Sequence, residues 1–232
     1  MSSATSQSEI IHSLRQRLLS VQHTTVTCPV ISSGIPQLDH LLPHRGFRPG
    51  SVVEIVSTVP GISGSVLAMH CLQQLLQQPG ACVVVDTLHQ FNPAAAAVAG
   101  ISLNRVMLIR PPLHDQRSQQ AVRSDLLWSL EQSARCPGVS AVLCWLDRAS
   151  STVLRRLQLA VESSGVTVFL MRPASCLRLT SWADVRLCCE PAFAVSGSCV
   201  NVRVVHSRHA VEHHGVVSLR IDHETSTVSE VS

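Results

Sequence analysis

The sequence predicts an α/β protein: a mostly parallel, twisted sheet flanked by helices, with antiparallel strands at its carboxyl end. Two patterns predict this fold class. From about residue 50 to residue 173, short and almost wholly apolar runs alternate with longer stretches of helical character. Such runs are typical of strands whose two faces are both covered by helices. After residue 182, strand-like runs follow one another with only turns between them, which is typical of an antiparallel meander.

The amino-terminal residues predict a short amphipathic helix. Over residues 8–21 the apolar side chains, Leu14 and Leu18 among them, fall on one helical stripe, and Ser8 is placed to cap its start. A helix of this length is unstable alone in water, so the stripe must pack against its own domain or against a partner reached across the linker. We expect three parts: this helix and its linker over 1–29, a core domain over 30–223, and a tail over 224–232.

The core domain begins with a loop and a short helical turn over residues 34–50. The next nine segments alternate between strand and helix, and three further strands close the domain. By their apolar patterns, the first strands are expected at 51–56, 81–86, 106–111, 139–146 and 166–173, the helices after Gly64 and at 92–100, 118–135 and 152–165, and the later strands at 182–191, 199–209 and 215–225.

The composition limits the chemistry. The 18 basic residues are all arginine, which excludes a lysine-dependent site, and the net charge of +3 permits contact with nucleic acid without predicting it. There is no apolar run long enough for a membrane helix and no signal-peptide pattern at the amino terminus. We therefore expect a cytoplasmic protein with no membrane partner. Nine cysteines without a CxxC pair are expected as reduced thiols, mostly in the core.

One loop lies where a phosphate-binding loop would lie. Residues 57–66, STVPGISGSV, connect the first strand of the core to its first long helix, and such a helix start presents backbone N–H groups to an anion. The usual lysine is absent. Two interpretations stay open: a backbone nest that still holds an anion, and a plain strand-to-helix turn, which we favour. The residues concerned are Pro60, Gly61, Ser63, Gly64 and Ser65.

Two possible metal sites have simpler interpretations. Cys188 and Cys189 are neighbours in an expected strand and therefore point to opposite faces, which argues against a metal or redox pair. A group of histidines near residue 210 has no acidic or cysteine ligand at regular helical spacing, so we expect solvated turn residues and no metal site. The group consists of His206, His209, His213 and His214.

The remaining candidates are common surface and core features. Arg45 and Arg48 flank a glycine and could contact phosphate, but two arginines in a surface loop are commonplace. Trp128, Trp145 and Trp182 lie in expected helices and strands and are expected in the core. There is no Gly-x-Ser-x-Gly nucleophile elbow, so we expect no catalytic residue.

Several stretches resemble the core of the RecA recombinase family. GIPQLDHLL, RPGSVVEIV and VVVDTLHQFNPAAAAVAGISLNRVMLIRP follow that family's order and much of its spacing, and SWADVRLCCEP looks like its late strand. The resemblance covers roughly residues 30 to 190 and rests on spacing more than on any single motif. It implies a RecA-like fold for the core domain.

The chain departs from that family at the groups that handle nucleotide. With the loop aligned on Gly64, Val59 stands at the first glycine, Ser65 at the lysine and Val66 at the magnesium-binding hydroxyl. Leu88 replaces the carboxylate that activates water, Trp145 the magnesium-associated acid, and Leu170 and Met171 the polar residues that sense nucleotide. We therefore expect no ATPase activity and no cofactor. The segments that hold DNA in the family are short here, which implies weak or indirect contact with DNA.

A closer resemblance is to the ImuA proteins, RecA-like partners of a mutagenic polymerase system. The stretch TVLRRLQLAVESSGVTVFLMRP, preceded by Trp145 and Leu146, resembles their corresponding block and, more distantly, that of the division inhibitor SulA. The ImuA resemblance implies a non-catalytic adaptor in the SOS response and translesion synthesis, with an ImuB-like polymerase homologue and RecA as protein partners. On this basis Leu14, Leu18, Arg155 and Arg156 are the expected partner-binding residues. A SulA-like inhibitor and a divergent RecA-type ATPase are the alternatives.

Overall fold

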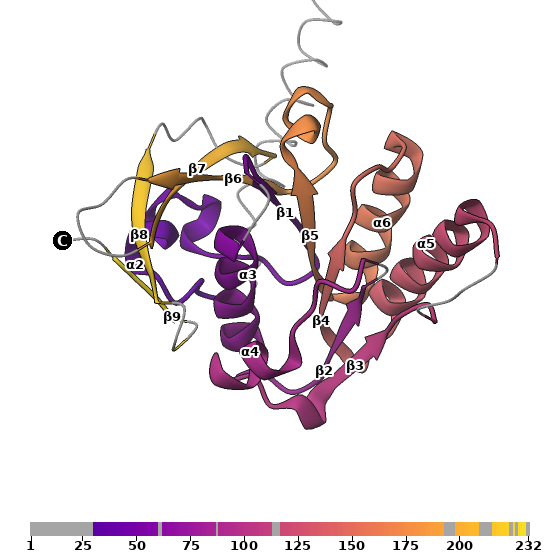
Figure 1. Ribbon diagram of the computed structural model, residues 1–232. Helices are drawn as coiled ribbons and strands as arrows, with labels where there is room; N and C mark the ends of the chain where they lie inside the picture. The colour runs from indigo at the N-terminus through magenta and orange to yellow at the C-terminus, as the bar shows by residue number, and fades with distance from the viewer. Residues whose placement is uncertain are drawn as a thin grey trace, which may run out of the picture.

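The computed structural model describes residues 30–59, 62–86, 88–112, 117–192, 198–208, 215–222, 225 and 227–230. In this part of the chain nine strands form one sheet, in the order β3-β2-β4-β5-β1-β6-β7-β8-β9 (Figure 1). The strands from β3 to β6 in that order are parallel, and β7, β8 and β9 are added antiparallel. The predicted fold class is confirmed. The expected amino-terminal helix, with Leu14 and Leu18, lies outside the described residues.

The strands are β1 (Val52–Ser57), β2 (Ala81–Val85), β3 (Val106–Ile109), β4 (Val139–Trp145), β5 (Thr167–Pro173), β6 (Val185–Ala192), β7 (Ser198–Ser207), β8 (Val216–Asp222) and β9 (Thr227–Glu230). The α-helices are α2 (Pro36–Leu41), α3 (Ile62–Leu75), α4 (Pro93–Val98), α5 (Gln119–Arg135) and α6 (Ser151–Ser164). Three short 3₁₀ turns, η1 (Pro43–Arg45), η2 (Leu103–Arg105) and η3 (Ala174–Arg178), connect them.

Local sequence fixes the ends of several helices. Asn92 caps α4 by accepting hydrogen bonds from two backbone N–H groups, with Pro93 at the first helical position. Ser118 and Ser150 cap α5 and α6, each accepting a hydrogen bond from one backbone N–H group. Gly165 ends α6 in the left-handed conformation, with φ of 81°. These signals explain why the helix starts and stops follow the expected positions closely.

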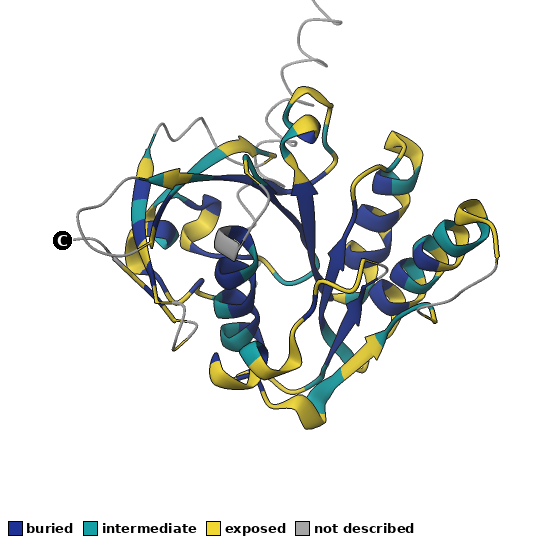
Figure 2. Ribbon diagram, viewed as in Figure 1, coloured by how far each residue is buried: buried dark blue, intermediate teal, exposed yellow. Residues whose placement is uncertain are grey.

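Helices cover both faces of the sheet. α2, α3 and α4 lie on one face, α5 and α6 lie on the other, and the antiparallel strands curve around α3 (Figure 1). Each face carries its own apolar core, and the central strands are buried on both sides (Figure 2). β1 lies at the centre, with Ile55 opposite Met171 of β5 and Leu187 of β6. None of the described helices is long and apolar enough to cross a membrane.

The sheet extends further than the sequence indicates. Residues 227–230 form β9 and pair with β8, Leu219 opposite Glu230 and Asp222 opposite Thr227. The segment expected as a carboxyl-terminal tail, 224–232, thus contains a strand of the sheet. Four residues carry a weak strand signal by themselves, and the ladder of β8 supplies the partner that they need.

Candidate functional site

The candidate site lies where the carboxyl ends of β1, β4 and β5 meet, at the edge where open parallel sheets bind ligands. A cavity of about 390 Å³ lies among these strand ends, the first turns of α3 and the segment after β2. Hydroxyl and apolar side chains dominate its lining, which includes Ser57, Ser65, Leu88, Trp145 and Met171. The cavity therefore stands in the place of a nucleotide site with a different chemical lining.

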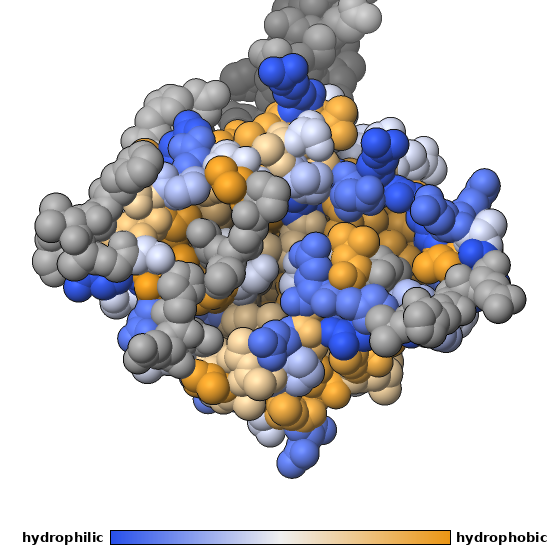
Figure 3. Space-filling model, viewed as in Figure 1, coloured by the Kyte–Doolittle hydropathy of each residue, from blue (hydrophilic) through white to orange (hydrophobic). Residues whose placement is uncertain are grey.

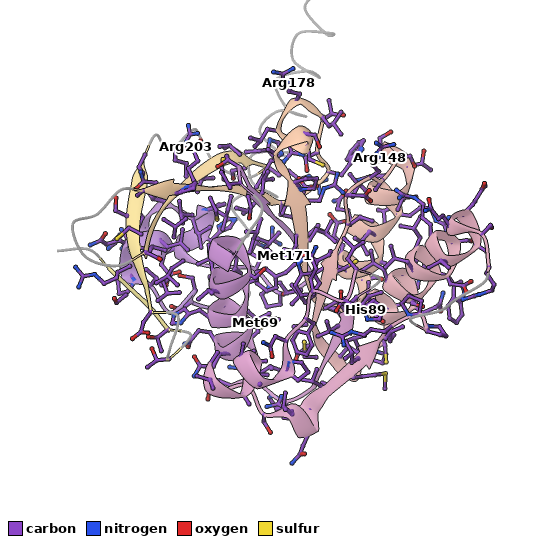
Figure 4. All side chains as sticks on the ribbon, viewed as in Figure 1. Met69, His89, Arg148, Met171, Arg178 and Arg203 are labelled. Atoms are coloured by element: carbon purple, nitrogen blue, oxygen red, sulfur yellow. The ribbon has the colours of Figure 1, made fainter. Side chains whose placement is uncertain are left out.

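The loop that begins α3 packs closely against the sheet at Gly64. A Cβ atom there would lie 2.4 Å from Ser57 Oγ, 3.2 Å from Met171 Cε and 3.3 Å from Ile55 Cγ2. Met171 occupies the centre of the molecule, on β5 (Figure 4). Glycine at this position thus allows helix and strands to approach closely. Pro60 and Gly61 lie outside the described residues, as does the side chain of Ser63. That this loop is a plain strand-to-helix turn therefore stays a prediction.

At the three aligned positions this cavity carries no cation and no water-activating carboxylate, and the arginine in its lining, Arg172, lies 3.8 Å from Glu54. Ser65 occupies the lysine position, the exposed Leu88 occupies the position of the base, and Trp145 is buried. The carboxylate that borders the cavity, Asp147, is engaged: it accepts hydrogen bonds from Arg123 at 3.3 Å and from the Arg148 backbone N–H at 2.7 Å. At the three aligned positions the lining thus offers hydroxyl and apolar side chains where a nucleotide site carries charged groups.

Asp86, at the end of β2, is a structural carboxylate. It is fully buried, accepts backbone hydrogen bonds from Gln90 and Phe91 at 2.9 and 2.8 Å, and pairs with Arg110 at 2.8 Å. All of these contacts hold the segment after β2 in place. Asp86 thus orders the loop that carries Leu88, and its oxygens are not free for a ligand.

A second buried charge cluster, which sequence analysis missed, lies on the α6 face of the sheet. Glu54 of β1 is 2.6 Å from Arg186 of β6 and accepts a hydrogen bond from Ser181 at 2.8 Å. Arg172 of β5 lies on the other side of Glu54, with 3.8 Å between Nε and Oε1. Its side chain alternates with Met171 along the strand and therefore points away from the face on which Met171 lies. The sequence signal that could have indicated this cluster is a single charged residue inside an otherwise apolar strand.

The structure separates the two arginines that were expected to bind a partner. Arg156 is 2.6 Å from Glu131 of α5, which also pairs with Arg135 at 2.7 Å. Burial by itself would raise the pKa of Glu131, but the hydrogen bonds from these two arginines outweigh burial and hold it below its usual value. Arg155 turns the other way, and its guanidinium lies 4.8 Å from the ring centre of Trp182. Arg156 is therefore committed to the contact between α5 and α6.

Two tryptophans are exposed, against expectation. Trp145 is buried as expected, but Trp128 on α5 is 65% exposed and Trp182 is 39% exposed. The apolar pattern predicted the helix that carries Trp128 and the strand-like run that begins at Trp182, but not that these two side chains point outward. Helical or strand periodicity does not show whether another element packs against a given face. An exposed tryptophan is a large apolar group left in water, and such groups are enriched in protein interfaces.

Most of the described cysteines are core thiols. Apart from the exposed Cys136, every cysteine in the described part of the chain is free and buried, Cys188 and Cys189 included. Within the described residues, no group of three or more potential ligands could hold a metal ion. His206 lies in β7, while His209, His213 and His214 lie outside the described residues.

Comparison with known proteins supports the fold assignment. The chain is 30% identical over 155 residues to the RecA protein of Chlorobaculum parvum, which covers 60% of this chain and 44% of that protein. It is 31% identical over 99 residues to RecA of Azospirillum lipoferum, covering 42% and 27%. It is 32% identical over 88 residues to RecA of Streptococcus pyogenes, covering 38% and 23%. The core of this chain is RecA-like.

The RecA-like core spans less than half the length of each of these curated relatives. A search of protein-family models found no match. The similarity is therefore distant and partial, and it assigns the architecture without assigning the activity of the whole relative.

Proposed function

We propose that this RecA-like chain is a non-catalytic adaptor in DNA-damage-induced translesion synthesis. Its partners would be proteins: an ImuB-like homologue of the Y-family polymerases, with RecA as a second. The observation that carries the proposal is the lining of the cavity at the strand ends, where Ser65, Leu88 and Trp145 stand at the positions of lysine, water-activating base and magnesium-associated acid. A RecA-like fold with this lining keeps its surfaces for binding and lacks groups for phosphoryl transfer.

The surface of the core supports a role in protein binding. β3 is the last strand of the described sheet on its side, and it pairs there with β2 alone. Its Met107 is 61% exposed, and Leu103, Leu108 and Trp128 are also exposed nearby in the fold. Figure 3 shows hydrophobic surface around this end of the sheet. A free strand edge with exposed apolar side chains is a favourable place for another chain to pair.

The amino-terminal stripe is the second proposed contact. Leu14 and Leu18 lie in the segment 1–29, outside the described residues, and the stripe has to be buried somewhere. The resemblance to ImuA favours a partner over the chain's own core. Of the two arginines expected to bind a partner, Arg156 pairs with Glu131 in the contact between α5 and α6. Arg155 therefore remains as the proposed partner-binding arginine.

The test is co-purification of the full chain with a Y-family polymerase homologue from the same source, and with RecA. We expect Leu14→Asp with Leu18→Asp to reduce capture about tenfold while the melting temperature of the core stays nearly constant, because the cost falls on the interface. Arg220→Gln, an exposed change on β8, serves as the matched control. Undiminished capture by the double variant would indicate that the amino-terminal helix packs against its own domain. Absence of any capture by the wild-type chain would overturn the adaptor proposal.

A further inference from the structure

A cationic and apolar patch lies beside α6, at the strap that connects β5 to β6. It consists of Arg155 and Leu159 from α6, and Arg178, Leu179 and Trp182 from the strap over residues 174–184. Leu159 is 48%, Leu179 is 52% and Trp182 is 39% exposed. Three large apolar side chains thus face water on these two short segments, which is unusual for a surface without a partner.

One contact joins the α6 part of this patch to the strap. The Arg155 guanidinium stacks on Trp182 at 4.8 Å, a cation–π contact that orients both side chains. Leu159 follows Arg155 by one helical turn and lies on the same side of α6. Arg178 extends away from the body of the molecule at the tip of the strap (Figure 4).

The strap is held firmly from below. Ser181 donates a hydrogen bond to the buried Glu54 at 2.8 Å, and Arg186 donates one to the Leu179 carbonyl at 2.9 Å. Because these bonds fix the backbone, the exposed side chains of the strap are presented in one arrangement. A preformed surface loses less conformational entropy when a partner binds.

In the described part of the chain, no carboxylate pairs with the two arginines of this patch. Among the described residues, neither Arg155 nor Arg178 has a salt bridge: Arg155 donates to the amide of Gln158, and Arg178 makes no polar contact. The nearest acid on this face of α6, Glu162, is already bonded by Arg208 at 3.0 Å and by Gln158. The neighbouring Arg156 differs, because Glu131 neutralises it.

We propose that this patch docks an acidic, apolar segment of a partner protein, one in which Asp or Glu side chains alternate with large apolar ones. The acids would meet Arg155 and Arg178, and the apolar side chains would cover Leu159, Leu179 and Trp182. Arginine and tryptophan at the centre of such a contact are the residue types that contribute most binding energy in interfaces. This proposal rests on the proposed adaptor function and specifies the chemistry of its partner.

Two other occupants fit less well. The chain's own segment 1–29 carries Arg15 and Arg17 against one acid, Glu9, so its charge has the same sign as the patch. Single-stranded nucleic acid matches the charge, but its bases need aromatic platforms for stacking. The patch offers one aromatic ring, Trp182, and the Arg155 guanidinium already covers one face of it.

The experiment uses the full chain as bait for a library of random 12-residue peptides displayed on phage. We expect enriched sequences to combine acidic and large apolar residues. Fluorescence anisotropy of the best labelled peptide should then show Kd at least about tenfold weaker for Arg155→Gln with Arg178→Gln, a change of about 1.4 kcal/mol. Leu159→Ser should weaken it too, while Arg220→Gln on β8 changes Kd less than about twofold. Circular dichroism confirms that each variant folds.

Several results would overturn the proposal. These are the absence of any enriched peptide, a basic consensus, or binding that is indifferent to Arg155 and Arg178. A labelled oligothymidine that binds the wild-type chain and is lost in the same double variant, with no effect on the peptide, would assign the patch to nucleic acid instead. If co-purification with the polymerase homologue persists in the double variant while no peptide is selected, the patch proposal fails and the adaptor function stands.

Discussion

Glu54 on β1 and Arg186 on β6 form a buried ion pair, with 2.6 Å between Glu54 Oε2 and Arg186 Nε. Both side chains are almost fully removed from water, at 0% and 5% exposure. The pair connects the centre of the sheet to the strap above it, because Glu54 also holds Ser181 and Arg186 also holds the Leu179 carbonyl. One carboxylate therefore organises the surface on which the proposed partner docks.

Glu54→Gln should destabilise the fold strongly. The amide cannot neutralise Arg186 or Arg172, and an uncompensated buried charge costs about 3–5 kcal/mol. Urea unfolding followed by circular dichroism measures the loss. Glu162→Gln is the matched control, since its pair with Arg208 has side chains 44% and 34% exposed and should contribute less than about 1 kcal/mol. Equal stability of the two variants would show that the buried pair is not a major contributor.

Gly64→Ala should lower stability through overpacking. The added Cβ would lie 2.4 Å from Ser57 Oγ, and such crowding costs about 1–3 kcal/mol, more than the helix propensity gained from alanine, about 1 kcal/mol. Ser57→Ala in the same chain should restore part of the loss, because the nearest contact then becomes Met171 Cε at 3.2 Å. Gly138→Ala, with nothing within 4 Å of its Cβ, is the control. Equal melting temperatures for Gly64→Ala and Gly138→Ala would contradict the packing role of Gly64.

The chain should not hydrolyse ATP and should not bind magnesium-ATP more tightly than about millimolar, because Ser65 and Val66 stand at the positions of the phosphate-binding lysine and the magnesium-binding hydroxyl. Isothermal titration calorimetry and a phosphate-release assay measure this. Ser65→Lys should not rescue turnover, since Leu88 still cannot activate water. Micromolar affinity for magnesium-ATP in the wild-type chain would instead favour a divergent ATPase.

The buried thiols should be unreactive in the native protein. Burial raises the pKa of Cys82, Cys144 and Cys189 from 9.0 to about 12, and the charge of Asp86 adds to the effect at Cys144. With iodoacetamide at pH 8, peptide mapping by mass spectrometry should find the exposed Cys136 alkylated rapidly and these three protected until the chain unfolds. Rapid native labelling of Cys144 would contradict this burial.

The same thiols predict how stability depends on alkaline pH. Their folded pKa is raised, so above pH 9 the folded chain keeps protons that the unfolded chain releases. The stability that they contribute is complete below about pH 9 and is lost as pH rises through about 12. Urea midpoints measured from pH 7 to pH 11 should therefore fall above pH 9. A flat profile would show that the thiols are not neutral core groups.

The sequence by itself determined the class of fold and the absence of lysine from the loop that begins α3. Apolar runs such as 139–146 indicate strands buried on both faces, and the helical patterns over 118–135 and 152–165 indicate helices, because these signals depend on neighbours along the chain. The composition alone excludes a lysine in the phosphate loop, since the chain contains none. The assignment of Leu88 to the position of the water-activating carboxylate likewise depended only on its spacing from Asp86 along the chain.

Tertiary structure alone decided which charges and aromatic rings meet. Glu54 reaches Arg186 across 132 residues of sequence, and Arg155 reaches Trp182 from a different element. The outward direction of Trp182 and the commitment of Arg156 to Glu131 depend equally on the packing of α5, α6 and the strap. Periodicity reports the face of a residue within its own helix or strand, whereas partners are set by how elements pack in three dimensions, and that information is not local.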